Sequence, residues 1–417
     1  MANCAHRLVR MIGELGRVTD EPGRLKRTFL SPAMKRANAL VGGWMREAGL
    51  KARVDSVGNL VGRLEAANPK AKILLLGSHL DTVRDAGKFD GALGVLLPIV
   101  ALGELRRRGV KLPFHVEVLG FSEEEGVRFA SAYLGSKGYC GKLGARDLAR
   151  RDADGISVGE ALARWNGPTP GLSKRVGVNA LLKPAHLLGK LIGYLEVHIE
   201  QGPVLEKEKL AVGVVSAIAG QSRCKLTWTG QAGHAGTTPM MLRRDALAGA
   251  AEFAVGVEKY ARALPGLVAT IGALTVSPGA GNVIPGEVVH TLDVRHPRDA
   301  GRRSALMHFG RLATRIARQR GLQRTWQRTQ DNGAVVCSPE LTAQLVRSVR
   351  AVQGRSIALV SGAGHDAVVM SALAPVAMLF VRCRGGLSHH PDEYASPADL
   401  KVALRVAVHF LERLAAE

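Results

Sequence analysis

Aromatic residues are scarce in this chain of 417 residues, where Phe, Trp and Tyr together make up 4%. Proteins that bind single-stranded nucleic acid stack the bases on aromatic side chains that lie among basic residues. The formal net charge of +21 is spread over scattered lysines and arginines without such a platform. We therefore expect no nucleic-acid partner, but a solvated basic surface of the kind that can steer an anionic substrate.

Cysteines and long apolar runs are also sparse. The five cysteines are widely spaced and form no CxxC pair, which argues against a disulfide framework or a thiolate zinc site and suits a reducing compartment. The longest apolar run, around residues 95–102, is too short to span a bilayer. The first residues predict an amphipathic helix and not a signal peptide. We expect a cytoplasmic protein with no membrane partner.

The length and the patterning of the first half predict a large α/β fold. A chain of 417 residues exceeds what one hydrophobic core usually holds. A helical pattern over residues 31–48 is followed by strand-like segments at 52–64 and 72–82, an apolar helix at 94–107 and the strand-like "FHVEVLGFSEEEG". Apolar runs that end in polar loops and helices are typical of parallel sheets, whose ligands gather at the carboxyl ends of the strands.

A different pattern begins near residue 211. Strand-like segments such as "SRCKLTWTG" and "GEVVHTLDVRHP" combine with helical patterns at 242–264 and 300–321, and the α/β pattern returns near residue 335. The fold class that we predict is α/β, with a discontinuous catalytic domain on a mostly parallel sheet and an inserted α+β lid or dimerisation domain. The predicted boundaries are 1–210 and 329–417 for the catalytic domain and 211–328 for the insert.

Histidines and carboxylates follow the apolar strand-like runs in order along the chain. They occur in five motifs: "SHLD", "KFDG", "FSEEEG", "EVHIEQGP" and "GGLSHHPDE". Nitrogen and carboxylate ligands without thiolate suit Zn²⁺ or Mn²⁺, and a shared carboxylate can bridge two ions. Each motif alone has a structural alternative, because acidic triplets often lie on solvated faces or at helix N-termini. Their ordered recurrence at strand ends favours a metal site.

The order of these motifs, together with "HIEQGPVLE" and "GHAGTTPM", resembles that of amidohydrolases that cleave N-carbamoyl groups. These enzymes belong to the aminoacylase–carboxypeptidase superfamily of dinuclear metallohydrolases, and the resemblance spans nearly the whole chain. Within the group, "DAGKFDG", "EGVRF", "SGAGHDA" and "FVRCRGGLSH" look most like allantoate amidohydrolases. N-carbamoyl-L-amino acid hydrolases come second.

The resemblance implies two divalent ions per subunit, Zn²⁺ or Mn²⁺, with Asp90 as the carboxylate between them. The implied metal ligands are His79, Asp90, Glu125, His198 and His389. Glu124 resembles the general base, and Asp81 would orient the imidazole of His79. A slip by one residue stays open in the glutamate triplet and at His390, although the adjoining Gly126 favours Glu125 and the "GGxSH" pattern favours His389.

The resemblance also implies residues that contact the substrate. His234 would reach across a dimer interface to polarise the scissile carbonyl, which predicts a homodimer formed through the lid. The implied substrate contacts are Gln201, Asn282, Arg295, Gly364 and His365. Arginine grips carboxylates through a planar fork, which suits an anionic substrate. The alternatives are a surface salt bridge for Arg295, a turn-stabilising role for His234 and a structural role for His365.

These observations predict metal-dependent hydrolysis of a ureido C–N bond in a small carboxylate substrate. The predicted reaction converts allantoate to ureidoglycine, CO₂ and ammonia. Hydrolysis of an N-carbamoyl-L-amino acid or of carbamoyl-β-alanine is the first alternative, with the same metal chemistry. A dipeptidase is disfavoured, because the lid motifs resemble those of the ureido-cleaving branch. A basic binding protein on a hydrolase scaffold is the non-enzymatic alternative, against which the complete set of base and ligands argues.

Overall fold

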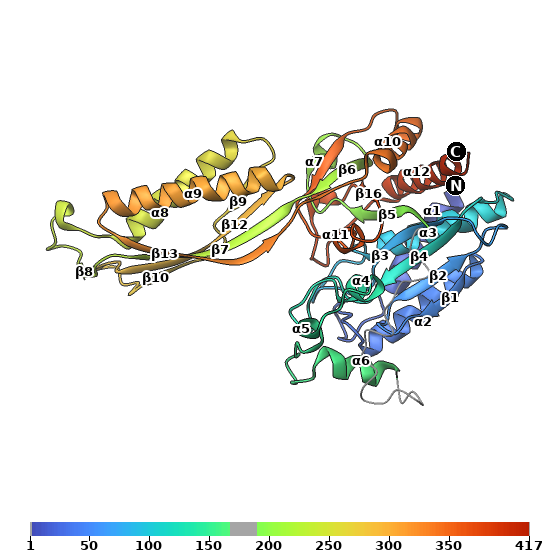
Figure 1. Cartoon of the computed structure of the whole chain (residues 1–417), viewed down its shortest axis with the longest axis horizontal. Coiled ribbons are helices and arrows are strands. Elements are labelled where there is room, and N and C mark those ends of the chain that lie inside the picture. The colour runs from blue at the N-terminus through green and yellow to red at the C-terminus, as the bar shows by residue number, and fades with distance from the viewer. Residues whose placement is uncertain (1, 167–189, 417) are drawn as a thin grey trace. The chain divides into compact units, whose positions relative to one another are not determined.

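The computed structural model describes residues 2–166 and 190–416 (Figure 1). Contacts divide the chain into two compact units. The first runs to Ser216 and takes in Cys337–Leu359 and the segment from Gly364 onward. The second comprises Ala217–Val336 and Val360–Ala363. The sequence placed the two divisions after residues 210 and 328 and did not assign residues 360–363 to the insert.

A nine-stranded sheet forms the centre of the first unit, in the order β1-β2-β4-β3-β5-β16-β6-β14, with β15 also paired to β6. The central strands β4, β3, β5 and β16 are parallel, whereas the pairs towards both edges are antiparallel. This confirms the predicted α/β class with a mostly parallel sheet. The strands are β1 Lys51–Val54, β2 Leu60–Leu64, β3 Ile73–His79, β4 His115–Phe121, β5 Leu191–Ile199, β6 Val212–Ile218, β14 Val335–Val336, β15 Ala358–Ser361 and β16 Val376–Val381.

The centre of this sheet is buried on both faces. Every residue of β3 ("ILLLGSH") and β4 ("HVEVLGF") is buried, as expected for parallel strands that helices cover on both sides. Helix α3 (Ala92–Arg107) packs on β3, β4 and β5. It is apolar around most of its circumference, and such helices lie inside a protein. Helices α1 (Ala2–Leu15) and α12 (Pro397–Ala416) pack against α3 and complete this layer.

The other helices of the first unit cover the remaining sheet. Helix α2 (Pro32–Glu47) packs on β1 and β2, and α10 (Pro339–Gln353) packs on α12 and β16. The short helix α11 (Ala367–Met370) packs on β5 and β16. The short elements that remain are α4 Leu134–Tyr139, α5 Ala145–Leu148, α6 Val158–Asn166, α7 Val204–Lys207 and the 3₁₀ turn η3 Arg384–Gly386.

The second unit has an antiparallel five-stranded sheet in the order β10-β12-β7-β13, with β9 paired to β12. Helices α8 (Ala246–Ala263) and α9 (Asp299–Gln319) cover one face of it (Figure 1). Side chains of β7 alternate between buried and less buried positions, as expected for a sheet with one covered face. The remaining elements are β7 Gly220–Thr229, β8 Gly233–His234, η2 Met240–Leu242, β9 Val268–Thr270, β10 Leu274–Ser277, β11 Val283–Ile284, β12 Glu287–His296 and β13 Gln323–Asn332.

Two local features differ from the sequence prediction. Residues 52–64 form a hairpin and not one strand, because the Asp55 carboxylate accepts the backbone N–H groups of Val57 and Asn59 and closes a turn. Strand β13, "QRTWQRTQDN", was not predicted at all, because its exposed polar residues show little apolar alternation. Among the described residues, no helix combines the length and the apolar character that crossing a membrane requires.

Candidate metal centre

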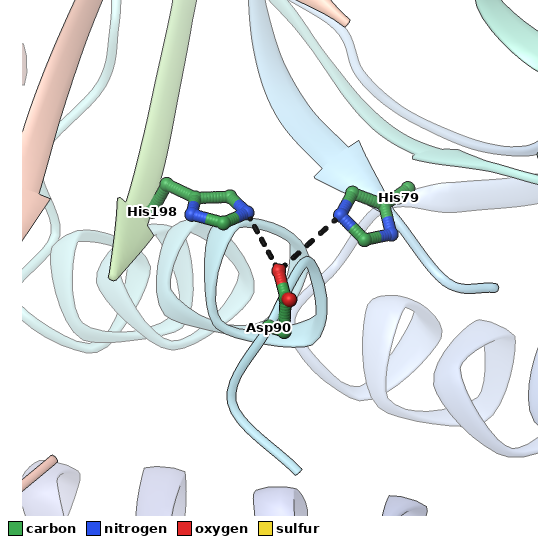
Figure 2. A group of neighbouring side chains, drawn as sticks. All are labelled: His79, Asp90 and His198. Carbon is green, nitrogen blue, oxygen red and sulfur yellow. Dashed lines mark ion pairs between the residues drawn. The ribbon is translucent and has the colours of Figure 1, made fainter. Parts of the chain in front are cut away.

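Three predicted ligands meet at the carboxyl end of the parallel sheet. His79 is the last residue of β3, His198 lies near the end of β5, and Asp90 lies two residues before the start of α3. Figure 2 shows one oxygen of Asp90 facing both imidazole rings. This Oδ1 atom lies 3.0 Å from Nε2 of His198 and 3.6 Å from Nε2 of His79. All three side chains are buried.

Hydrogen bonds fix the orientation of both imidazoles. Nδ1 of His79 lies 3.0 Å from the carbonyl oxygen of Asp81, and Nδ1 of His198 lies 2.9 Å from that of Ile199. A carbonyl oxygen only accepts, so each Nδ1 carries a hydrogen and each Nε2 is the atom that faces Asp90. Lone pairs cannot face a carboxylate oxygen this closely unless a proton or a cation lies between them. The donor set therefore fits a divalent ion such as Zn²⁺ or Mn²⁺.

The second oxygen of Asp90 faces a different set of donors. Its Oδ2 atom lies 3.2 Å from Nε2 of His389, which is 3.6 Å from Oε1 of Glu125. In each of three groups, the donor atoms lie within 4.8 Å of one another: His79, Asp90 and His198; Asp90, Glu125 and His389; and His79, Glu124 and Glu125. All five predicted ligands thus come together, and Asp90 belongs to two groups. One carboxylate between two donor sets is the arrangement that a pair of ions requires.

Asp81 joins the ends of β3 and β4. Its carboxylate accepts the N–H groups of Glu124 and Glu125 at 2.9 and 3.1 Å and lies 3.4 Å from Nδ1 of His79. Glu123 takes another direction, because its Oε1 accepts the N–H of Gly126 at 2.7 Å. The triplet therefore presents Glu124 and Glu125, and not Glu123, to His79.

The charges of the site shift one another's pKa values. Burial raises the pKa of Asp90, but the imidazoles of His198, His389 and His79 outweigh it and hold this pKa well below its usual range. Hydrogen bonding to Asp90 raises the pKa of His389 to about 9. Burial and the Asp90 charge raise the pKa of Glu125 to about 7. Burial, Glu125 and Asp366 also raise the pKa of Glu124 well above the ordinary glutamate value, against the opposing pull of His79.

Left-handed backbone conformations cluster at the site. His389 and Gln201 each have φ of 56°, a conformation that is costly for residues other than glycine and often marks functional sites. The Gln201 amide donates to Ser388 at 3.1 Å and approaches Asp90 at 3.4 Å, while its Oε1 is buried without a hydrogen-bond partner among the described residues. Gly91 has φ of 63°, and a Cβ atom there would overlap the His79 ring.

His365 and Gly364, two predicted substrate contacts, lie beside this cluster. His365 is 1% exposed, and its ring packs edge-on against His198 with centroids 4.6 Å apart. Burial and the neighbouring His198 hold the pKa of His365 well below the ordinary value, so that its ring is neutral. Gly364 lies against the hydroxyl of Tyr133, and a Cβ atom would collide with it. In this position His365 supports the His198 ring, and its contact with a substrate stays a prediction.

Of the predicted residues of the second unit, His234 and Arg295 lie on strands, and Asn282 directly precedes strand β11. Nδ1 of the exposed His234, on β8, accepts the N–H groups of Gly236 and Thr237 at 3.0 and 3.2 Å. Its Nε2 must therefore carry the hydrogen of the neutral ring. The carbonyl oxygen of Asn282 accepts the N–H of Ala235, which sets Asn282 next to His234.

Arg295 on β12 forms the ion pair that the sequence left open as an alternative. Its Nε and Nη2 donate to the two oxygens of Asp293 at 2.9 and 3.1 Å, and its Nη1 donates to the carbonyl of Gly362. Arg223 and Gln221 also donate to Asp293. The guanidinium is therefore held in a fixed orientation on the strand, and one N–H of Nη1 and one of Nη2 have no acceptor among the described residues.

Sequence reasoning missed two residues that touch the cluster. The hydroxyl of Ser388 lies 3.1 Å from Oδ2 of Asp90, and the buried Glu393 accepts the backbone N–H of Asp90 at 3.0 Å. Both stand in the quoted "GGLSHHPDE" motif, in which only the histidines were considered as ligands. The polar residues on either side of His389 were the signal that could have found them.

Known proteins resemble this chain over nearly its whole length. The chain is 40% identical to allantoate deiminase 2 of Glycine max, covering 97% of this chain and 89% of that protein. It is 39% identical to the N-carbamoyl-L-amino acid amidohydrolase of Geobacillus stearothermophilus, covering 98% of both. The crystal structure of a hydantoinase/carbamoylase-family amidase from Burkholderia multivorans superposes with a TM-score of 0.90 at 34% identity, covering 99% of this chain and 98% of that one.

The family match agrees with the geometry of the site. Residues 75–413 match the peptidase family M20/M25/M40, and this range contains every member of the three donor groups. The members of this family are dinuclear metal enzymes, and the relatives act on ureido or carbamoyl groups. The chain therefore belongs to the peptidase family M20/M25/M40, as a metal-dependent amidohydrolase of its hydantoinase/carbamoylase branch.

Proposed function

We propose that this enzyme hydrolyses a ureido C–N bond of allantoate, using two divalent cations held by the five clustered ligands. The observation that supports this most directly is the position of Asp90, whose two oxygens face separate donor sets. His79 and His198 would hold one side of this pair, and His389 and Glu125 the other. Bound cations would polarise the ureido carbonyl and make an attacking water more acidic.

Glu124 is the residue that we assign to proton transfer. It is buried beside the donor groups but is not needed to complete either group around Asp90. A carboxylate whose pKa is raised by its surroundings is a better proton acceptor, and it can take a proton from water and return it to the leaving nitrogen. Asp81 would hold Glu124 in place through its backbone N–H and would orient the His79 ring from behind.

The remaining polar groups suit a ureido acid. The Nε2–H of His234 is a fixed donor for the developing oxyanion, and Asn282 lies directly before the paired strand β11, with its carbonyl bonded to Ala235. The buried Oε1 of Gln201, which has no partner in the described part of the chain, can accept an N–H of the ureido group. Arg295 retains two N–H groups, which can bind the substrate carboxylate.

N-carbamoyl-L-amino acid hydrolysis is the second candidate. It is supported by the bacterial relative at 39% identity, almost equal to the 40% of the plant allantoate deiminase. Both substrates offer a ureido group next to a carboxylate, so the metal chemistry would be the same. Allantoate comes first because the loops "DAGKFDG", "SGAGHDA" and "FVRCRGGLSH" resemble those of the allantoate enzymes.

A substrate panel tests this proposal. Protein reconstituted with Zn²⁺ or Mn²⁺ is assayed for ammonia release from allantoate, N-carbamoyl-L-amino acids and N-carbamoyl-β-alanine, with a dipeptide as the amide control. Hydrolysis of the dipeptide is followed by the release of free amino acid, because it yields no ammonia. We expect the highest kcat/KM for allantoate and loss of all activity with a chelator. A higher value for an N-carbamoyl amino acid would transfer the assignment to the second candidate. Activity that survives complete metal removal would contradict both.

We also propose a homodimer formed through the second unit and a cytoplasmic location. Near His234, the side chains of Met240, Met241 and Leu242 are 73%, 93% and 73% exposed, and such apolar patches are typical of interaction surfaces. The five cysteines are all free, as is usual in a reducing compartment. Sedimentation of the purified protein tests the dimer.

A further inference from the structure

A buried carboxylate that no metal group includes lies directly behind Asp90. Glu393 is 2% exposed, and its Oε1 accepts the backbone N–H groups of Phe89 and Asp90 at 2.9 and 3.0 Å. More than 300 residues of chain separate the two segments. Glu393 therefore attaches the loop that bears Asp90 to the segment that bears His389.

The second oxygen of Glu393 reaches Asp90 through a hydroxyl. Ser388 Oγ lies 3.1 Å from Oε2 of Glu393 and 3.1 Å from Oδ2 of Asp90, and it accepts a hydrogen bond from Gln201 at 3.1 Å. A hydroxyl has one hydrogen to donate, so Asp90 and Glu393 share the hydrogen of Ser388. Glu393 thus fixes the backbone position of Asp90, and it also competes with the Asp90 carboxylate for the hydrogen of the Ser388 hydroxyl.

The loop before Asp90 is shaped for this contact. A Cβ atom at Gly87 would overlap the carboxyl group of Glu393, so a larger residue at position 87 would push that carboxyl away from the N–H groups it accepts. Close approach of a backbone to a functional group is a common reason for glycine. The contact is therefore built from both segments.

We propose that Glu393 is a positioning residue of the metal centre, which sets the rotation of Asp90 so that each carboxylate oxygen faces one donor set. The inference rests on the proposed ligation by Asp90. If these hydrogen bonds served only to stabilise the fold, they could attach this loop through any of its backbone groups. Here they end on the N–H and on Oδ2 of Asp90 itself, the atoms that decide how this carboxylate bridges.

Metal binding to the full-length, metal-free protein tests the inference without any assay of turnover. The variants are Glu393→Ala, Glu393→Gln and Ser388→Ala. The matched control is Asp392→Asn, which removes an exposed carboxylate one residue away that pairs only with His390 among the described residues. Zn²⁺ affinity is measured by competition with a chelator, the visible spectrum of the Co²⁺-loaded protein reports ligand geometry, and thermal unfolding of the metal-free protein reports stability.

We expect Glu393→Ala to weaken Zn²⁺ binding about 10- to 100-fold, as is usual when a group that orients a metal ligand is lost, and to change the Co²⁺ spectrum. The Zn²⁺ affinity of Glu393→Gln should lie between those of Glu393→Ala and the wild type, because its amide oxygen still accepts both N–H groups while its NH₂ faces Ser388. Ser388→Ala should weaken Zn²⁺ binding as well, and Asp392→Asn should keep the Zn²⁺ affinity and the Co²⁺ spectrum of the wild type.

The inference would be overturned if Glu393→Ala kept the Zn²⁺ affinity and the Co²⁺ spectrum of the wild type and only its unfolding temperature fell. Glu393 would then contribute to stability alone. If Glu393→Ala does not fold, Gly87→Ala displaces the carboxyl without removing it and decides the same question. Asp90→Ala separates this from the proposed function. Full metal occupancy in that variant would refute the ligand assignment, whereas loss of metal there with normal binding in the Glu393 variants would refute the positioning role alone.

Discussion

Glu124 and Glu125 are neighbours in the chain with different expected roles, and substitution separates them. Glu124→Gln should retain both ions and lower kcat by about 10²- to 10⁴-fold, because it removes the proton acceptor and no needed ligand. Glu125→Gln should lose metal, because Glu125 completes the group with Asp90 and His389. Elemental analysis and steady-state kinetics on both variants measure this. Metal loss in the first variant and not in the second would show that the assignment within the triplet is wrong.

Gly91 tests how closely the backbone must approach a ligand. Gly91→Ala adds a methyl group against the His79 ring at a φ of 63°, so we expect weaker Zn²⁺ binding together with lower stability. Gly109→Ala is the matched control, because Gly109 has a φ of 73° but open space around its Cβ position. Gly109→Ala should lower the free energy of unfolding by about 1–2 kcal/mol, the strain of a left-handed backbone at a residue other than glycine, and leave Zn²⁺ affinity unchanged. Equal affinities of the two variants would contradict the role of Gly91.

Some residues of the metal centre could be predicted from the sequence and others could not. The five ligands were predictable because their residue types recur in short motifs at strand ends, where a parallel sheet collects them. Glu393 was not, because its role depends on hydrogen bonds to a backbone about 300 residues away. The same holds for the ring orientation of His198, which a carbonyl oxygen fixes, and for the burial of His365.

At the scale of elements, burial decided which strands could be predicted. β3 and β4 are apolar runs buried at every position, and helix α3 has the apolar character of a buried helix, so that composition alone located them. β13 pairs along β7 through its backbone, while its own side chains are mostly polar and at least partly exposed. Backbone pairing leaves no pattern in such a sequence.

Strand β12 carries a prediction about substrate charge. If the free N–H groups of Arg295 bind the substrate carboxylate, Arg295→Lys should lower kcat/KM for allantoate about 10- to 100-fold, because a charge-assisted hydrogen bond contributes about 1.5–3 kcal/mol and lysine lacks the fork. For an analogue with an amide in place of the carboxylate, the same substitution should lower kcat/KM much less. Asp293→Asn, which loosens the guanidinium, should have a smaller effect in the same direction. Equal losses on both substrates would restrict Arg295 to holding the strand.

For the whole molecule, metal binding should be linked to the release of protons. With pKa values raised to about 9 for His389 and well above the ordinary value for His79, both rings carry a proton near neutral pH, which a cation must displace. Affinity for Zn²⁺ should therefore rise with pH. Calorimetric titration in buffers of different ionisation enthalpy measures the number of protons released. A heat of binding that is independent of the buffer would contradict this linkage.

Subunit assembly carries the final prediction, which rests on His234. Its Nε2–H is exposed and fixed by two backbone N–H groups, yet it belongs to the second unit, whereas the metal ligands belong to the first. If His234 completes the site of the partner subunit, neither His234→Ala nor Glu124→Gln should be active alone. Mixed subunits should regain activity, because one site of each heterodimer then has Glu124 from one chain and His234 from the other.

Random exchange of the two variants should yield up to about a quarter of the wild-type activity, since half of the dimers are mixed and each holds one intact site. Native mass spectrometry of the mixture confirms that heterodimers form. The control is a mixture of Glu124→Gln with Asp90→Ala, in which each chain carries a substitution in its own metal-bearing unit, so that no site of the heterodimer is intact and no activity should return. Activity of the His234 mixture no higher than that of its parents, with exchange demonstrated, would assign His234 to its own subunit or remove it from catalysis.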